Sequence, residues 1–176
     1  MAISTAILLG LRFLEYRKQS MENLFSSIEN AIKEKYGDLE SPDYSFLAKE
    51  EEKNPYAEFV RWVETQGFAA TNDTDFNTDV SFHYRFEKND KTYIVRMSLV
   101  GRFSVFARID GDGIALIHED EASDPLAVEI LEGLKKYGIP CLDEETISRR
   151  YPISLIDLEE GEATVFNALF STDNYR

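Results

Sequence analysis

Several side chains with ligand-binding chemistry fall on one face of a predicted β-sheet. Between residues 80 and 118 the apolar residues recur at every second position, which is the period of a β-strand. Arginine recognises carboxylate or phosphate groups through paired hydrogen bonds, so several arginines on one sheet face could bind an anion. One hypothesis is therefore a groove for an anionic small molecule, serving as a binding site or an active site. The residues predicted to line it are His83, Arg85, Arg96, Phe106 and Arg108.

The same arginines have a second interpretation. Residues 81–108 contain six Lys or Arg and two acidic residues, a net charge of +4 within an acidic chain. Acidic helices packed nearby could neutralise this segment and leave no ligand site. The sequence keeps both interpretations open.

A dense acidic segment follows directly. Residues 109–145 contain eleven Asp or Glu and two Lys, a net charge of −9. Complementary charge speeds the encounter of two proteins and rejects wrong partners, so this segment predicts a surface for a basic protein. A solvated loop and helix start is the alternative, because a helix N-terminus favours acidic residues. The predicted partner-binding residues are Asp110, Asp112, Glu119, Asp120, Glu121 and Asp124, with Glu50 to Glu52 as a second acidic run.

The chain has few side chains suited to a transition metal. A zinc site needs about four Cys, His or carboxylate ligands, and the only His and Cys residues are His83, His118 and Cys141. Cys141 lies in an apolar segment without a basic neighbour, which predicts a buried, unreactive thiol. Nucleotide-binding and hydrolase motifs are missing from the sequence. We expect no metal, no cofactor and no catalytic residues, and we interpret the chain as non-enzymatic.

The composition predicts a folded, acidic protein. Of the 176 residues, 43% are hydrophobic and 12% are aromatic, which favours a packed core over disorder. The formal net charge of −14 disfavours general binding to nucleic acid or to an anionic membrane surface. A single cysteine excludes an intrachain disulfide and gives no indication of an oxidising compartment. We expect a cytoplasmic protein.

Residues 1–20 are predicted to form an N-terminal extension or a partner-docking helix. Their apolar window, residues 6–14, is far shorter than the roughly 20 residues that a membrane span needs. No Lys or Arg precedes this window, although a secretory signal would have one there. We therefore predict no membrane span.

Helices are predicted where apolar residues recur at three and four positions and where helix stop signals follow. Gly37, Gly67 and Gly138 supply three of these stops. Asp124 and Pro125 supply a start, as cap and first helical residue. The predicted helices cover residues 21–36, 56–66, 125–137 and 143–150, with residues 38–54 as a connector.

Four strands between residues 80 and 118 are predicted to form an antiparallel meander. Its turns lie at Asn89-Asp90, Gly101 and residues 110–113. With tight turns centred there, the core face carries Tyr84, Val95, Ala107 and Leu116 in one row and Phe86, Tyr93, Ile109 and Ile114 in the next. The opposite face then carries His83, Arg85, Ile94, Arg96, Phe106, Arg108, Ala115 and Ile117.

The C-terminal region is predicted to be a β-hairpin. Residues 153–158 and 163–170 are rich in β-branched or large apolar residues, and Glu159 to Glu162 separate them. Residues 165–170 fit a helix face equally well.

These elements predict a single α+β domain over residues 1–176, with helices packed on one sheet face. In size and charge alone, the chain is similar to small bacterial immunity proteins and to acidic secretion chaperones. Our leading hypothesis is a binding protein of the immunity or inhibitor type, antitoxin-like, that neutralises a basic toxin or nuclease. The alternatives are the anion-binding or catalytic domain described above, and a chaperone-like or structural subunit that docks through residues 6–14.

Overall fold

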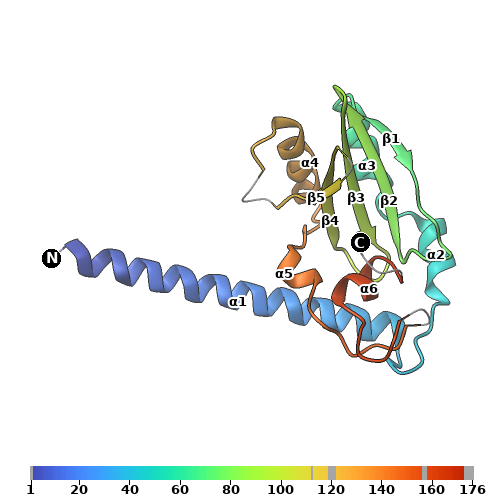
Figure 1. Ribbon diagram of the computed structural model, residues 1–176, viewed down its shortest axis with the longest axis horizontal. Helices are drawn as coiled ribbons and strands as arrows, with labels where there is room; N and C mark the ends of the chain where they lie inside the picture. The colour runs from blue at the N-terminus through green and yellow to red at the C-terminus, as the bar shows by residue number, and fades with distance from the viewer. Residues whose placement is uncertain (1, 112, 119–121, 156–157, 173–176) are drawn as a thin grey trace.

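The computed structural model describes residues 2–111, 113–118, 122–155 and 158–172, with side chains for residues 18, 19 and from 21 onward. They form an α+β fold around a five-stranded antiparallel sheet (Figure 1). The strands follow one another in the order of the sequence, so each pairs with its neighbours along the chain. They are β1 (Ala69–Asn72), β2 (Ser81–Lys88), β3 (Lys91–Ser98), β4 (Ser104–Asp110) and β5 (Gly113–Leu116).

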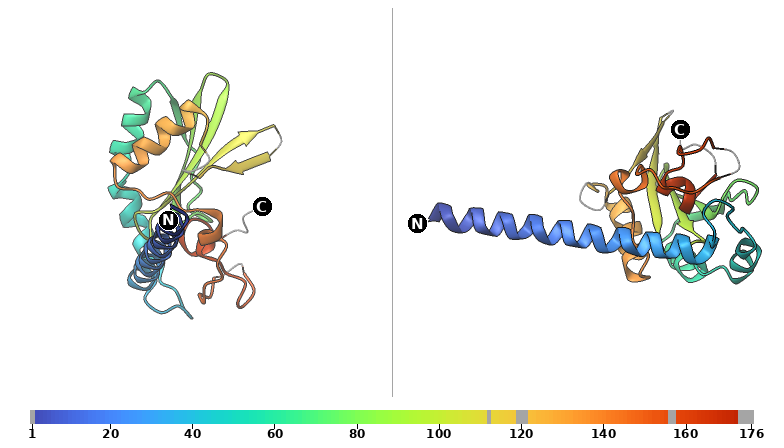
Figure 2. Two further views of the ribbon diagram at one scale, coloured as in Figure 1. Left: turned by 90° about the vertical axis from the view of Figure 1, so that its left-hand side faces the viewer. Right: turned by 90° about the horizontal axis from the view of Figure 1, so that it is seen from below.

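In the described parts of the chain, six helices pack around this sheet or at its end. Figure 2 shows α3 and α4 on one side of the sheet and α6 on the other. Helix α1 passes the end of the sheet, and its N-terminal half extends beyond the rest of the fold (Figures 1 and 2). The helices are α1 (Ala2–Tyr36), α2 (Phe46–Lys53), α3 (Ala57–Thr65), α4 (Pro125–Lys136), α5 (Glu144–Ile147) and α6 (Val165–Leu169).

One sheet face packs against α3 and α4, and we call it the helix-covered face. Successive side chains of a strand point to opposite faces, so every second residue of β2, β3 and β4 enters this core. Each buried aromatic or aliphatic side chain of this size stabilises the fold by roughly 1.5–3 kcal/mol. The buried strand residues are Phe82, Tyr84, Phe86, Tyr93, Val95, Met97 and Phe106.

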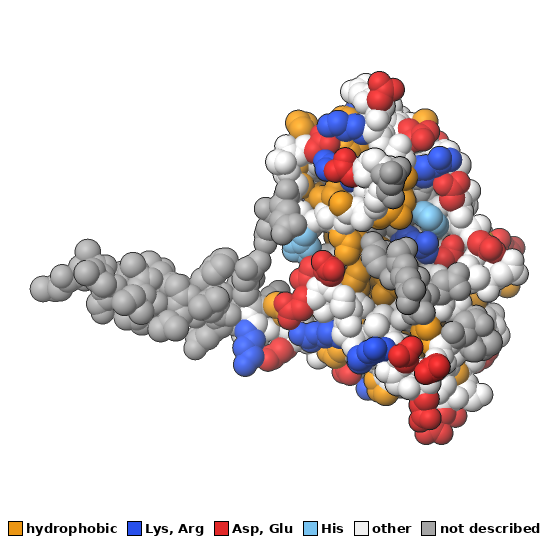
Figure 3. All heavy atoms as spheres, viewed as in Figure 1, with side chains coloured by type: hydrophobic (Ala, Val, Ile, Leu, Met, Phe, Trp, Pro, Cys, Tyr) orange, Lys and Arg blue, Asp and Glu red, His pale blue; other side chains and the backbone are white. Residues whose placement is uncertain are grey.

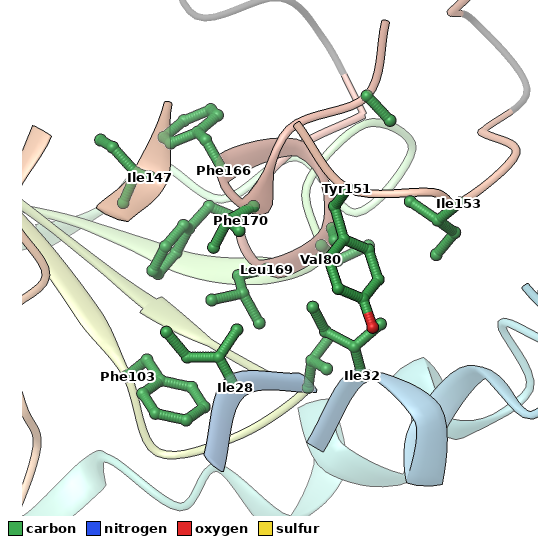
Figure 4. Packing of buried hydrophobic residues seen from close by; sticks show 14 of the residues in the cluster. Ile28, Ile32, Val80, Phe103, Ile147, Tyr151, Ile153, Phe166, Leu169 and Phe170 are labelled. Carbon is green, nitrogen blue, oxygen red and sulfur yellow. The ribbon is translucent and has the colours of Figure 1, made fainter. Parts of the chain in front are cut away.

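A second core joins the C-terminal half of α1 to α5, α6 and the adjoining end of the sheet. Ile28 and Ile32 point from α1 towards Leu169, and Phe103 lies beside Ile28 (Figure 4). The buried Tyr36 hydroxyl donates a hydrogen bond of 2.9 Å to the carbonyl oxygen of Ala168. This contact ties α1 to α6 across most of the sequence.

Helix α4 starts as predicted. Asp124 has an extended backbone, and its side chain accepts a hydrogen bond from the backbone N–H of Leu126, while Pro125 occupies the first turn. The first hairpin is also confirmed. Asn89 and Asp90 have φ angles of 53° and 59°, which fits the two-residue turn between β2 and β3.

The prediction was wrong for the pairing of β3 with β4. We expected Val95 opposite Ala107, around a turn centred on Gly101, but Val95 lies opposite Phe106 and Ile94 opposite Ala107. The connection is a four-residue loop, residues 99–102, closed by a 2.9 Å hydrogen bond from the N–H of Ser98 to the carbonyl of Phe103. A one-residue change of register moves every side chain to the other face. The pairing of β4 with β5 is as predicted. The side chains of both strands therefore point to the faces opposite to the predicted ones.

Three further elements differ from the prediction. The sheet has a fifth strand, β1, which pairs with β2, and α2 forms within the expected connector. The C-terminal hairpin is absent from the described residues, where α6 and isolated bridges are found instead. The Thr164 side chain bonds the N–H of Asn167, and the Asn167 side chain bonds the N–H of Thr164. This capping box starts a helix where the hairpin's second strand was expected.

Candidate functional site

The face opposite α3 and α4 is partly uncovered, and we call it the open face. It contains a hollow of about 360 Å³, within the size range of small ligand sites. In Figure 3 hydrophobic side chains are visible near the centre of this side of the molecule, with charged and histidine side chains beside them. The hollow has an apolar floor and a polar end. The floor and one wall are formed by Ile94, Val105, Ala107, Ile114, Leu116 and Phe166, and the polar end by Asp73, Asp75, Thr78, Asp79, His83, Arg96 and Ser171.

The pairing of β2, β3 and β4 sets the positions of His83 and Arg96 at the polar end of the hollow. His83 on β2 lies opposite Arg96 on β3, and Arg96 lies opposite Val105 on β4. Arg96 Nη1 donates a hydrogen bond of 2.6 Å to Oδ1 of Asp79, whose side chain is only 6% exposed. The same guanidinium lies 5.9 Å from the ring centre of Phe166 in α6. Arg96 is therefore held in place by an acid and an aromatic ring.

The other two predicted anion donors also have acidic neighbours. Arg85 Nε lies 3.1 Å from Asp73 Oδ2, and Arg108 Nη2 lies 2.6 Å from Asp110 Oδ2. An anionic ligand would have to compete with a carboxylate at each of the three arginines, which weakens the anion hypothesis.

The predicted set of anion-binding residues also does not share one face. The register of β4 differs from the prediction, so Phe106 points to the helix-covered face. It is buried there, with 1% of its surface exposed, and does not form a wall of the hollow. Arg108 lies opposite Tyr93 and so belongs to that face as well. Ala107, Ile109, Ile114 and Leu116, which we had assigned to the core face, lie on the open face instead.

His83 is half-buried beside the hollow. Its backbone N–H donates to Thr74 Oγ1 at 2.8 Å, and its carbonyl accepts from the N–H of Asp73 at 2.8 Å. Desolvation lowers the pKa of its imidazole, and the positive charge of Arg96 lowers it further. The lowered pKa favours the neutral form of His83, so this residue contributes little to an anion site.

Carboxylates outnumber cations at the polar end. Asp73 and Asp79 are paired with Arg85 and Arg96, whereas Asp75 forms no ion pair with a described residue. Asp75 Oδ1 accepts two hydrogen bonds from Asn77, at 3.0 and 2.8 Å, and its side chain is exposed. Our sequence reasoning missed these three acids, although the run Asp73-x-Asp75 before the first predicted strand is visible in the sequence.

The predicted acidic partner surface is described only in part. Asp112, Glu119, Asp120 and Glu121 lie outside the described residues. Asp110 is exposed and paired with Arg108.

Asp124 has a structural role. Its Oδ2 accepts hydrogen bonds from Lys91 Nζ at 2.8 Å and from the Tyr93 hydroxyl at 2.6 Å, in addition to capping α4. Burial raises the pKa of Asp124, but the hydrogen bonds from Lys91, Tyr93 and the N–H of Leu126 outweigh burial and lower it. This carboxylate binds other parts of its own chain, so it offers little to a partner.

Among the residues whose side chains are described, two of the three exposed large hydrophobic residues are neighbours on the open face. Ile109 and Ile114 are 39% and 57% exposed and lie directly opposite each other in β4 and β5. The third, Val128, is on α4. We had expected both isoleucines in the core, and the change of register explains their exposure.

The remaining candidate residues form no joint site. Within the described parts of the chain, no group of three or more His, Cys, Asp or Glu side chains is arranged to hold a metal ion. Cys141 is half-buried rather than fully buried. None of the helices in the described residues is long and apolar enough to cross a membrane.

Comparison with protein-family models, with curated proteins and with solved structures finds no match to this chain.

Proposed function

We propose that this chain is a non-enzymatic protein-binding domain that engages a basic protein through the β4–β5 end of its open face. The observation that carries the proposal is the exposure of Ile109 and Ile114, side by side, in a chain with a net charge of −14. Contiguous exposed apolar residues rimmed by polar ones are typical of interaction sites. The excess of acid favours a partner of opposite charge.

The sequence around β5 supports the same class of partner. Asp110 and Asp112 precede the strand, and Glu119, Asp120 and Glu121 follow it. The sequence on both sides of β5 is therefore acidic, which favours a basic partner. An inhibitor or immunity protein for a basic toxin or nuclease is the specific form of this proposal.

Affinity capture from cells of the source organism tests the proposal when matched variants are included. The full chain, Ile114→Asn and the control Val128→Asn are used as baits, since both variants replace an exposed aliphatic residue on different faces. We expect a basic protein on the wild type and on Val128→Asn, with at least a tenfold loss on Ile114→Asn. Equal capture by all three baits would contradict the proposal.

Salt dependence tests the acidic component. A variant that carries Glu119→Gln, Asp120→Asn and Glu121→Gln should bind the captured protein more weakly at low salt, and its affinity should change less as salt is added. Exposed charges are screened over about 10 Å at 0.1 M salt, so this effect should disappear at high ionic strength. An unchanged affinity and salt dependence would show that the partner binds elsewhere.

A second candidate function is small-molecule binding in the hollow, which its volume of about 360 Å³ favours. A panel of anionic metabolites should then raise the melting temperature of the wild type and not of Arg96→Met. If cations or neutral compounds give the only shifts, the anion hypothesis is wrong.

A further inference from the structure

Strand β5 is an edge strand of the sheet, and among the described strands it pairs with β4 alone. The N–H of Ile117 donates to the carbonyl of Phe106 at 2.8 Å, which makes these opposed residues a hydrogen-bonded pair. Hydrogen-bonded and non-hydrogen-bonded pairs alternate along an antiparallel ladder. Ala115 therefore directs its backbone groups to β4, and Ile114 and Leu116 direct theirs away from the sheet. The described residues provide no hydrogen-bond partner for these outward groups.

Strand β5 is a short edge of four residues, and it carries neither of two common features with which proteins block strand pairing, a charge or a proline. Natural edge strands carry charged residues or proline, or are covered. Residues 113–116 read Gly-Ile-Ala-Leu, without charge or proline. Leu116 lines the hollow, and the Ile114 side chain is 57% exposed. A strand placed here would find hydrogen bonds and an apolar surface at the same position.

We propose that an extended segment of the basic partner adds to the sheet along β5 as a sixth strand. Its main chain bonds the outward N–H and C=O groups of Ile114 and Leu116, and its alternate apolar side chains pack on the open face beside them. In this mode of recognition, main-chain hydrogen bonds provide the affinity and the contacts of alternate side chains provide the specificity. Lys or Arg in the segment matches the charge of this part of the chain, because residues 109–145 carry a net charge of −9. The inference rests on the proposed function and specifies how the partner binds.

The net charge of the chain favours a strand from another protein over a strand from a second copy of this chain. Two copies would bring together net charges of −14 each, and such self-repulsion keeps proteins monomeric. A basic segment removes this repulsion. The net charge thus disfavours the pairing of β5 with the β5 of a second copy.

Selection of peptides on the full chain tests the proposal. The probe is a phage-displayed library of random 12-residue peptides. We expect enrichment of peptides with alternating apolar residues and with Lys or Arg. Enrichment of acidic or proline-rich peptides, or no enrichment, would overturn the proposal.

Two substitutions at one position separate main-chain bonding from side-chain packing. Ile114→Ala keeps the outward N–H, and Ile114→Pro removes it without removing a bond to β4. The selected peptides should bind Ile114→Pro at least about tenfold more weakly than Ile114→Ala. Ala70→Pro is the control, because it removes an outward N–H at the opposite edge, on β1, and should leave peptide affinity unchanged. Equal affinities for the two position-114 variants would exclude strand addition.

Amide hydrogen exchange of the wild type provides a readout that does not depend on how the variants fold. The amides of Ile114 and Leu116 should exchange quickly in the free protein and become protected when a selected peptide binds. Exchange that stays fast at both amides would overturn the inference. In that case, capture of a basic protein that is sensitive to Ile114→Asn would still support the proposed function, with another mode of docking.

Discussion

Asp79 and Arg96 form the most buried ion pair among the described residues, with side chains only 6% and 21% exposed. Arg96 donates to Oδ1 of Asp79 at 2.6 Å, and Oδ2 accepts from the N–H of Asp75 at 3.1 Å. Asp79 also forms a β-bridge with Ser171. The pair thus connects β3, the loop before β2 and the C-terminal region beside the hollow.

Removal of the arginine should destabilise the fold strongly. Arg96→Met keeps most of the apolar stem but leaves Asp79 buried without its cation, which costs about 3 kcal/mol of unfolding free energy. Urea denaturation measures the change. Arg108→Met is the matched control, since the pair with Asp110 is exposed, with side chains 36% and 66% accessible, and its loss should change the unfolding free energy far less. Equal losses of unfolding free energy for the two variants would show that the buried Arg96–Asp79 pair stabilises the fold no more than the exposed pair does.

Asp124 should make stability dependent on acid pH. Its pKa is lower in the folded protein than in the unfolded chain, so its stabilisation is present above the ordinary value of about 4 and is lost as the pH falls through the lowered pKa. Asp124→Asn should cost about 1–2 kcal/mol at pH 6, because hydrogen bonds to a charged group are lost.

Denaturation of both proteins between pH 6 and pH 2 tests this prediction. The difference between wild type and Asp124→Asn should shrink towards the acid end, where the carboxylate is protonated in both the folded and the unfolded wild type. A difference that is constant with pH would mean that the ionised form of Asp124 contributes nothing.

His83 should titrate below the ordinary histidine value of about 6.5. Desolvation is the main cause, and the positive charges of Arg96 and Arg85 add to it, while Asp79 and Asp73 oppose it. Because the unfolded chain binds this proton at higher pH, the stabilisation from neutral His83 is lost as the pH falls from 6.5 towards the folded-state pKa.

The imidazole proton signals of His83 in NMR spectra report this midpoint directly. Arg96→Met should move it upward, and Arg108→Met should not. A midpoint at or above 6.5 in the wild type would show that the imidazole is hydrated.

Gly133 should resist replacement by alanine, although alanine favours helices by about 1 kcal/mol. A Cβ at this position would lie 2.1 Å from Cζ3 of Trp62, so the ring would have to move. We expect Gly133→Ala to lower the unfolding free energy by about 1 kcal/mol or more. In a Trp62→Leu background the same change should be neutral or stabilising. Additive effects of the two substitutions would show that they do not meet.

The sequence by itself determined the elements whose signals are local. Asp124 and Pro125 start α4 because a cap and a first-turn proline act on the nearest backbone groups. Asn89 and Asp90 set the first hairpin because both tolerate positive φ, and β2–β3 pairing is as predicted. For α6 the apolar spacing of residues 165–170 left a helix open beside the predicted hairpin, and the capping box of Thr164 and Asn167 is the local signal that favours the helix.

Only the tertiary structure decided which face each residue of β4 and β5 occupies. Alternation places Phe106 and Ala107 on opposite faces but does not say which one enters the core. That choice depends on the loop between β3 and β4 having four residues, and the loop is closed by a contact between Ser98 and Phe103. A shift of one residue in this register buries Phe106 and exposes Ile109 and Ile114. The candidate site therefore differs from the one that the sequence predicted. Pairing between strands is cooperative over the whole sheet, and no short window of sequence contains it.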